Sequence, residues 1–387
     1  MDSKKKLTES ILIIAIILSN ISQIPSLFGN PIIKSGYALA WMLLFAILLF
    51  RKWFGFNMDF LIPPVIFDML CLLGWAFGKD YMASSLFVPI NMSAFILTIG
   101  FLFGALVDEQ IIKKIAIAYI ASSIIVGGVL YVTVFRGIDW SGSSTYVYAS
   151  KNSAAQFLLV GLILVATLFY VRHRIASGFL IIAYAVLIFM MKSRATIAAL
   201  AIYLIYFIFF IVVSKRERNF YLFLVVIFGL VVVFNPDANH LIIQEIIFNN
   251  RGTDMTTLSS GRDLHWKTFR QEFGKYLFWG TGGTYLESMP LAVLMSYGVI
   301  GGVPILLFAL KPLIYAIKNM WDKRYRIYSL LVVSISLTML VNSIFEEQAP
   351  FGPGVKCYFL WLLFGMYIGK KQYDLLNNYN EEINYNE

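Results

Sequence analysis

Long apolar runs separated by short charged segments recur along the whole chain. A bilayer core of about 30 Å needs roughly 20 apolar residues at about 1.5 Å of helical rise each, so uncharged runs of about 17 residues or more are candidate membrane spans. The pattern predicts an all-α polytopic membrane protein with about twelve spans in a single integral membrane domain, residues 1–387. The predicted spans are residues 11–29, 35–50, 60–77, 86–106, 115–135, 152–171, 175–191, 195–213, 219–235, 290–310, 327–345 and 351–369.

Two of these runs are weaker than the others, and the count becomes eleven if one of them is not a span. Residues 35–50 form a short run, and residues 60–77 are interrupted by two prolines and an aspartate. Residues 11–29 follow three lysines, as in a signal peptide, but no small-residue cleavage site comes after them. We therefore expect an uncleaved first helix.

The composition agrees with this class of protein. The chain of 387 residues is 59% hydrophobic and only 14% charged, which is more apolar surface than a water-facing domain can bury. Cys71 and Cys357 lie in different apolar runs, so we expect packing residues and neither a disulfide nor a thiolate metal site.

The positive charges lie mainly in loops on the side of the amino terminus. With about twelve spans, most of the 31 Lys and Arg residues fall on that side, which predicts that both termini are cytoplasmic. This bias accounts for the net charge of +9 without a nucleic-acid partner. The positive charges on the other side need a separate explanation.

The first of these outward charges are Lys192 and Arg194, between the seventh and eighth predicted spans. Cations at the amino end of a helix oppose its dipole by about 0.3 to 1 kcal/mol each. An unpaired guanidinium near membrane depth costs several kcal/mol. We therefore expect an anionic partner beside Arg194.

The second outward group lies in the only long loop, residues 236–289. Within it we expect an amphipathic helix that starts with a serine cap just before Arg262. At helical spacing, Arg262 falls on one apolar stripe with Trp266 and Phe273, so it points toward the membrane side and needs a partner. A phosphate would satisfy it, since arginine grips phosphate oxygens with parallel hydrogen bonds. The alternatives are lipid headgroups or a carboxylate such as Asp254.

A glycine-rich turn, Gly280-Thr281-Gly282-Gly283, closes this loop and allows a sharp change of direction. It is not a nucleotide-binding loop, because the Walker lysine and the preceding strand are absent.

In this order, three stretches resemble the O-antigen polymerase and O-antigen ligase superfamily, the Wzy-like membrane glycosyltransferases. The stretches are Lys192-Ser193-Arg194-Ala195, Ser260-Gly261-Arg262 with Trp266, and Gly280-Thr281-Gly282-Gly283 followed by Tyr297-Gly298-Val299-Ile300-Gly301-Gly302. The resemblance extends from about residue 150 to 310.

The resemblance implies a metal-independent and cofactor-independent polymerase in the bacterial cytoplasmic membrane. It would join polyprenyl-diphosphate-linked oligosaccharide repeat units into a surface polysaccharide at the outer face. Membrane lipids surround it, and a chain-length regulator is a further candidate partner. The outward arginines are implied to bind the diphosphates.

The chain departs from the family where a His-Asn pair usually precedes the re-entering helix, because Glu287-Ser288-Met289-Pro290 stands there instead. Glycosyl transfer needs cations for the leaving diphosphate and a base for the acceptor hydroxyl. As catalytic residues we expect Arg194 and Arg262 for the diphosphate, with Glu287 as the base and Glu346, or its neighbour Glu347, as its rival. As residues that bind diphosphate or sugar we expect Lys192, Arg270, Trp266 and Lys151.

Two alternatives remain open. A ligase would transfer a finished glycan to an acceptor, and the missing histidine argues mildly against it. A lipid-linked oligosaccharide flippase would show paired repeats with interrupted helices, and no convincing internal repeat is present.

Overall fold

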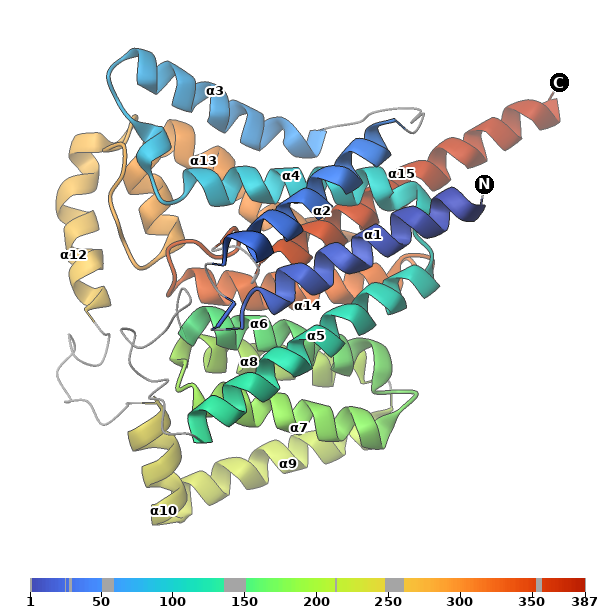
Figure 1. Ribbon diagram of the computed structural model, residues 1–387. Helices are drawn as coiled ribbons and strands as arrows, with labels where there is room; N and C mark the ends of the chain where they lie inside the picture. Colours follow the sequence, from blue (N-terminus) through green and yellow to red (C-terminus); the bar gives the residue numbers. More distant parts are fainter. Residues whose placement is uncertain are drawn as a thin grey trace.

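Helices make up all the regular structure in the part of the chain that the computed structural model describes, which is residues 2–24, 26–27, 30–50, 59–135, 151–212, 214–247, 261–352 and 357–386 (Figure 1). The long helices are α1 (Asp2–Ile21), α2 (Pro31–Leu49), α3 (Ile62–Ala76), α4 (Phe87–Phe103), α5 (Glu109–Phe135), α6 (Lys151–Leu164), α7 (Arg174–Met190), α8 (Arg194–Tyr206), α9 (Lys215–Phe234), α12 (Arg262–Glu272), α13 (Met289–Lys318), α14 (Arg326–Ser343) and α15 (Tyr358–Asn386). The short ones are η1 (Asp59–Leu61), η2 (Tyr81–Ala83), η3 (Gly104–Leu106), η5 (Val165–Phe169), η6 (Phe207–Ile211), α10 (Pro236–Asn239), η7 (His240–Ile247) and η8 (Phe273–Tyr276).

Apart from α12, the long helices run between two ends of the molecule (Figure 1). One end, on the right of the figure, carries both chain termini, and we name it the terminal end. The opposite end carries α12, and we name it the α12 end. Consecutive helices alternate in direction, so α6, α8 and α13 all begin at the α12 end.

Nine helices in the described residues are long and apolar enough to cross a membrane. The helix α7 is apolar but shorter, at 17 residues. The predicted count of twelve spans is therefore not confirmed, although each predicted run overlaps a helix. Predicted and observed bounds differ most for the first and last runs. The helix α1 includes the charged residues Lys4 to Lys6, and α15 continues past Lys370.

The predicted long loop is largely helical in its described parts. The helices α10, η7, α12 and η8 all lie between α9 and α13, and residues 248–260 are outside the described part. The amphipathic helix that was predicted in this segment is present as α12.

Ion pairs at the terminal end join segments that the charge pattern placed on one side of the membrane. Lys5 pairs with Asp108 at 3.2 Å, and Arg174 pairs with Glu217 at 2.7 Å. The second pair links the starts of α7 and α9. These charged segments therefore lie together at the terminal end of the molecule.

The helices α4 and α15 approach each other closely in the core, and glycines make this contact possible. Gly100 and Gly104 of α4 face Gly365 and Gly369 of α15. A Cβ atom at Gly365 would lie 2.2 Å from the Leu97 carbonyl oxygen, which is far inside van der Waals contact. Small residues at this spacing let helix backbones approach closely in membranes.

The two cysteines are buried free thiols. Cys71 lies in α3, and Cys357 directly precedes α15.

Candidate functional site

The helix α12 begins directly at Arg262, at the α12 end of the bundle. Its N-cap is Gly261, which adopts φ 80°, and the serines predicted to cap this helix, Ser259 and Ser260, lie outside the described residues. Phe269 and Phe273 stack with ring centroids 4.6 Å apart and pack against the core. This apolar face turns the first residue of the helix toward the bundle, and the Arg262 side chain is only 20% exposed.

Arg262 contacts two segments that are distant from it in the sequence. Its Nη2 lies 3.1 Å from Glu287 Oε2 and donates to the Phe345 carbonyl oxygen, also at 3.1 Å. The guanidinium carbon lies 5.8 Å from the centroid of the Phe345 ring. A carboxylate, a carbonyl and an aromatic face therefore hold the cation. The carboxylate is Glu287, whereas Asp254 lies outside the described residues.

Glu287 lies just before α13, in a segment without helical structure. The Tyr285 hydroxyl donates to its Oε1 at 3.4 Å, and the Glu287 side chain is 32% exposed. The ring of His265, one turn into α12, packs edge-on against Tyr285. The predicted base is therefore an ion-paired carboxylate at the surface of the site.

Glu346, the rival base, is held by a different set of residues. Asn152 Nδ2, in the first turn of α6, donates to Glu346 Oε1. Asn152 Oδ1 in turn accepts from Ser193 Oγ at 2.8 Å, and the Glu346 carbonyl oxygen accepts from Met289 N–H at 3.1 Å. These bonds join α6, the α7–α8 turn, the segment after α14 and the start of α13. We name the whole group the Arg262 cluster, which consists of Arg262, Tyr285, Glu287, Phe345, Glu346, Asn152 and Ser193.

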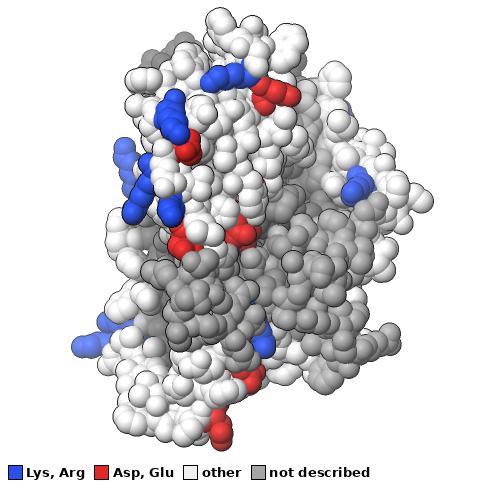
Figure 2. Space-filling view, turned by 90° about the vertical axis from the view of Figure 1, so that its left-hand side faces the viewer, with Lys and Arg blue, Asp and Glu red and all other residues white. Residues whose placement is uncertain are grey.

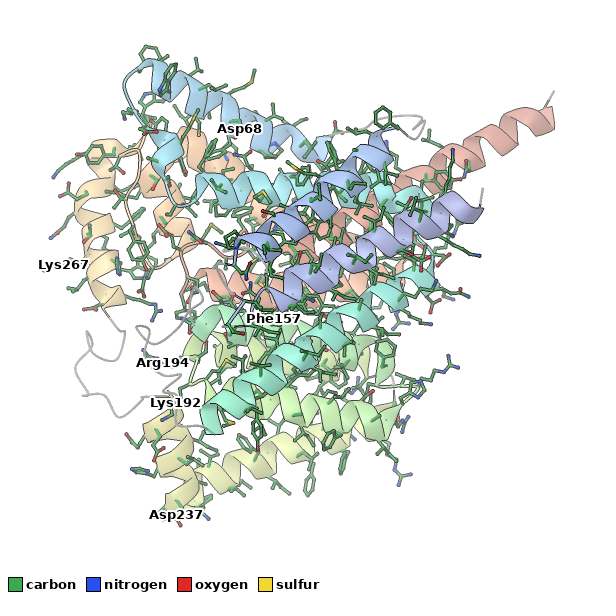
Figure 3. The ribbon with its side chains drawn as sticks, viewed as in Figure 1. Asp68, Phe157, Lys192, Arg194, Asp237 and Lys267 are labelled. Carbon is green, nitrogen blue, oxygen red and sulfur yellow. The ribbon has the colours of Figure 1, made fainter. Side chains whose placement is uncertain are left out.

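The turn that carries Lys192 and Arg194 meets this cluster through Ser193. Ser193 precedes α8 and is fully buried, and its hydroxyl bonds to Asn152 and Thr196 instead of capping the helix. Lys192 adopts φ 48°, a left-handed conformation that is uncommon for a non-glycine residue. Figure 3 shows Lys192 and Arg194 at the same end of the bundle as α12. Both side chains are partly buried.

The glycine-rich segment supports the site by pairing with a break in α13. Gly298, inside α13, has φ 64°, and the broken turn accepts hydrogen bonds from the N–H groups of Thr281 and Gly282. A Cβ atom at Gly280 would lie 2.3 Å from the Ser296 carbonyl oxygen, so the two backbones meet where only glycine fits. Lys79 Nζ donates to the Gly280 carbonyl oxygen at 2.9 Å. This pairing fixes the chain that leads to Glu287.

Two predicted residues lie outside the cluster, and the side chain of a third is not among the described ones. Trp266 is 45% exposed. Arg270 is exposed in the last turn of α12, about 12 Å along the helix axis from Arg262. Lys151 begins α6, but its side chain is outside the described part. Figure 2, which views this end face on, shows Lys and Arg atoms beside Asp and Glu atoms on a described surface that is otherwise mostly uncharged.

Burial changes the acidity of two groups near the cluster. Glu347 is 7% exposed, and its burial raises the pKa of the carboxyl, partly offset by a hydrogen bond with Ser85. Desolvation and the carboxylates of Glu287, Glu347 and Glu346 raise the pKa of Tyr285 to about 12. The Tyr285 phenol is therefore a neutral hydrogen-bond donor at neutral pH.

Sequence reasoning underestimated Asn152 and Tyr285. The sequence feature that could have pointed to Asn152 is an amide side chain at the amino end of an apolar run, which is weak evidence for a site. For Tyr285 the feature is its position two residues before Glu287. Neither signal indicated which distant segment the residue would contact. Among the described residues, no group of three or more His, Cys, Asp or Glu side chains is arranged so that it could hold a metal ion.

The chain matches no model of a known protein family and no curated protein.

Proposed function

We propose that this protein is a membrane glycosyltransferase that polymerises polyprenyl-diphosphate-linked oligosaccharides into a surface polysaccharide. The observation that supports the proposal is the Arg262 cluster. The sequence predicts that Arg262, Glu287 and Glu346 serve one reaction. In the structure they lie at one end of an apolar helical bundle, as does the turn that carries Arg194.

The cluster contains the groups that this reaction needs. Arg262 would hold the diphosphate through its guanidinium, with Arg194 as a second cation, and so stabilise the charge of the leaving group. The acceptor hydroxyl oxygen would form a bond to the anomeric carbon of the donor sugar while the bond from that carbon to the phosphate oxygen breaks. The polyprenyl diphosphate would leave with the bonding electrons.

The hydroxyl proton would pass to a carboxylate, and we assign this role to Glu287. Glu287 pairs with Arg262, whereas Glu346 Oε1 accepts a hydrogen bond from Asn152. Glu346 would shape the site from the opposite side. Glu287, and not Glu346, stands where the resemblance would place the usual histidine.

The same proposal places the α12 end outside the cytoplasmic membrane and both termini inside. The terminal end carries Lys5, Lys114, Arg174 and Lys370, in segments next to the apolar helices. Lys and Arg in such short segments are retained on the cytoplasmic side.

The test is a vesicle assay in which purified protein receives a lipid-linked repeat unit and the products are separated by size. A ladder of products that disappears in Arg262→Ala supports the polymerase. A single product, with the glycan joined to a different acceptor, would replace it with the ligase. Intact substrate moved to the opposite leaflet would replace it with the flippase.

A further inference from the structure

The Glu287–Arg262 ion pair occupies the position at which the proposed substrate would bind. Arg262 Nη2 is 3.1 Å from Glu287 Oε2, and the arginine side chain is only 20% exposed. An anion that binds this guanidinium must therefore compete with a carboxylate of the same chain. In any reaction at this site, Glu287 is the first competitor of the ligand.

Glu287 and the Phe345 carbonyl oxygen, which both contact Arg262, differ in how easily they can move. The Phe345 carbonyl oxygen belongs to the backbone beside Glu346, whose own carbonyl oxygen is bonded to Met289 N–H. Glu287, in contrast, is 32% exposed and lies in a non-helical segment before α13. Its side chain can rotate toward water without unpacking the core. Arg262 can therefore exchange the carboxylate for another anion and keep its bond to Phe345.

We infer that Glu287 determines specificity at this site: it blocks Arg262 against singly charged phosphodiester headgroups and gives way to a diphosphate. This inference rests on the proposed function, because it assumes that a lipid-linked diphosphate is the substrate. It adds that the carboxylate excludes the anionic lipids which surround the site at high local concentration.

The physical basis is a difference in charge and in the number of acceptor atoms. A carboxylate tethered beside Arg262 has a high effective concentration, so a phosphodiester with the same single charge gains little by replacing it. The diphosphate of a lipid-linked sugar has two negative charges and more oxygens, so it can bind Arg262 and a second donor together. A second cation, Arg194, lies at the same end of the bundle. Binding of the diphosphate also releases Glu287 to accept the proton.

The experiment measures binding without turnover. Wild type and Glu287→Gln are placed in vesicles of phosphatidylcholine, and the affinity for inorganic diphosphate is measured by calorimetry. The measurement is repeated in phosphatidylcholine mixed with phosphatidylglycerol. The matched control is Glu272→Gln, which removes a carboxylate from α12 that pairs with Lys275.

Without the competing carboxylate, Glu287→Gln is expected to bind diphosphate about threefold to tenfold more tightly than wild type in phosphatidylcholine. Phosphatidylglycerol should then weaken diphosphate binding to Glu287→Gln several-fold more than to wild type or Glu272→Gln. Equal or weaker binding by Glu287→Gln would overturn the inference. An equal effect of phosphatidylglycerol on all three proteins would also overturn it.

A second variant maintains the test if Glu287→Gln does not fold. Glu287→Asp retains the charge but shortens its reach, so its affinity for diphosphate should lie between those of wild type and Glu287→Gln. If Glu287→Asp binds diphosphate no more tightly than wild type, diphosphate does not displace Glu287 from Arg262.

Failure of this inference and failure of the proposed function give different results. If wild type forms a product ladder but Glu287→Gln binds diphosphate no more tightly, only the exchange is wrong. If wild type binds diphosphate but forms no ladder, the polymerase is wrong.

Discussion

Asn152 Nδ2 donates a hydrogen bond to Glu346 Oε1 and so joins the first turn of α6 to the segment after α14, across 194 positions of sequence. The same amide accepts a hydrogen bond from Ser193. One side chain therefore sets the distance between a carboxylate of the site and the turn that carries Arg194. We regard Asn152 as a positioning residue.

Asn152→Ala should lower the rate of polymerisation about 10-fold to 100-fold, because a hydrogen bond to a charged group contributes about 1.5 to 3 kcal/mol. The rate is measured from the ladder in vesicles. Asn91→Ala is the matched control, because Asn91 donates to the carboxylate of Asp68 at 3.0 Å, on α4 and α3. A full rate in Asn152→Ala would show that its two bonds do not position the site.

Arg262→Lys should reduce diphosphate affinity about 10-fold or more, although the charge is retained. A lysine ammonium is a point charge without the planar fork that grips two oxygens, so it is a poor substitute at a bidentate site. The measurement is the binding of inorganic diphosphate to purified protein. Lys267→Met removes a cation from the exposed surface of the same helix and should have little effect. Equal losses in both variants would mean that only the net charge of α12 matters.

Glu347→Gln should stabilise the protein at neutral pH and have no stabilising effect in acid. Burial raises the pKa of the folded-state carboxyl above the ordinary value of 4.5, so the ionised form destabilises the fold. This cost is absent below about pH 4.5, where the carboxyl is protonated both folded and unfolded, and it is complete above the folded-state pKa. Thermal unfolding of wild type and variant across this pH range checks the sign. A larger advantage of the variant in acid than at neutral pH would contradict it.

Gly365→Ala should destabilise the bundle by about 1 to 3 kcal/mol, because the new Cβ would overlap the Leu97 carbonyl oxygen on α4. Unfolding in detergent measures the loss. Gly229→Ala is the control, since nothing lies within 4 Å of a Cβ at that position in α9. If both variants unfold alike, the close approach of α4 and α15 is not important for stability.

The membrane class of the protein and most of its helices follow from the sequence alone. Each predicted apolar run overlaps a helix, because a run of this length has no stable conformation in lipid other than a helix. The helix that begins at Arg262 was also predictable, since its apolar residues recur at helical spacing. Helix ends were less certain. The ends of α1 and α15 lie among charged residues, where the hydrophobic pattern stops but the backbone hydrogen bonding continues.

Tertiary structure alone decided which of these residues meet. The sequence indicated that Arg262 needs an anionic partner, but pairing with Glu287 depends on how α12 packs against the start of α13. The sequence showed that Asn152 lies at the end of an apolar run, but not that its hydrogen-bond partner is Glu346. A hydrogen bond between distant segments leaves no local pattern in the sequence. The glycines of α4 and α15 became a contact only when both helices were in place. Local sequence patterns predict the hydrogen bonds that a helix forms within itself. The hydrogen-bond partner of a polar side chain at a helix end is instead supplied by whichever segment packs beside it.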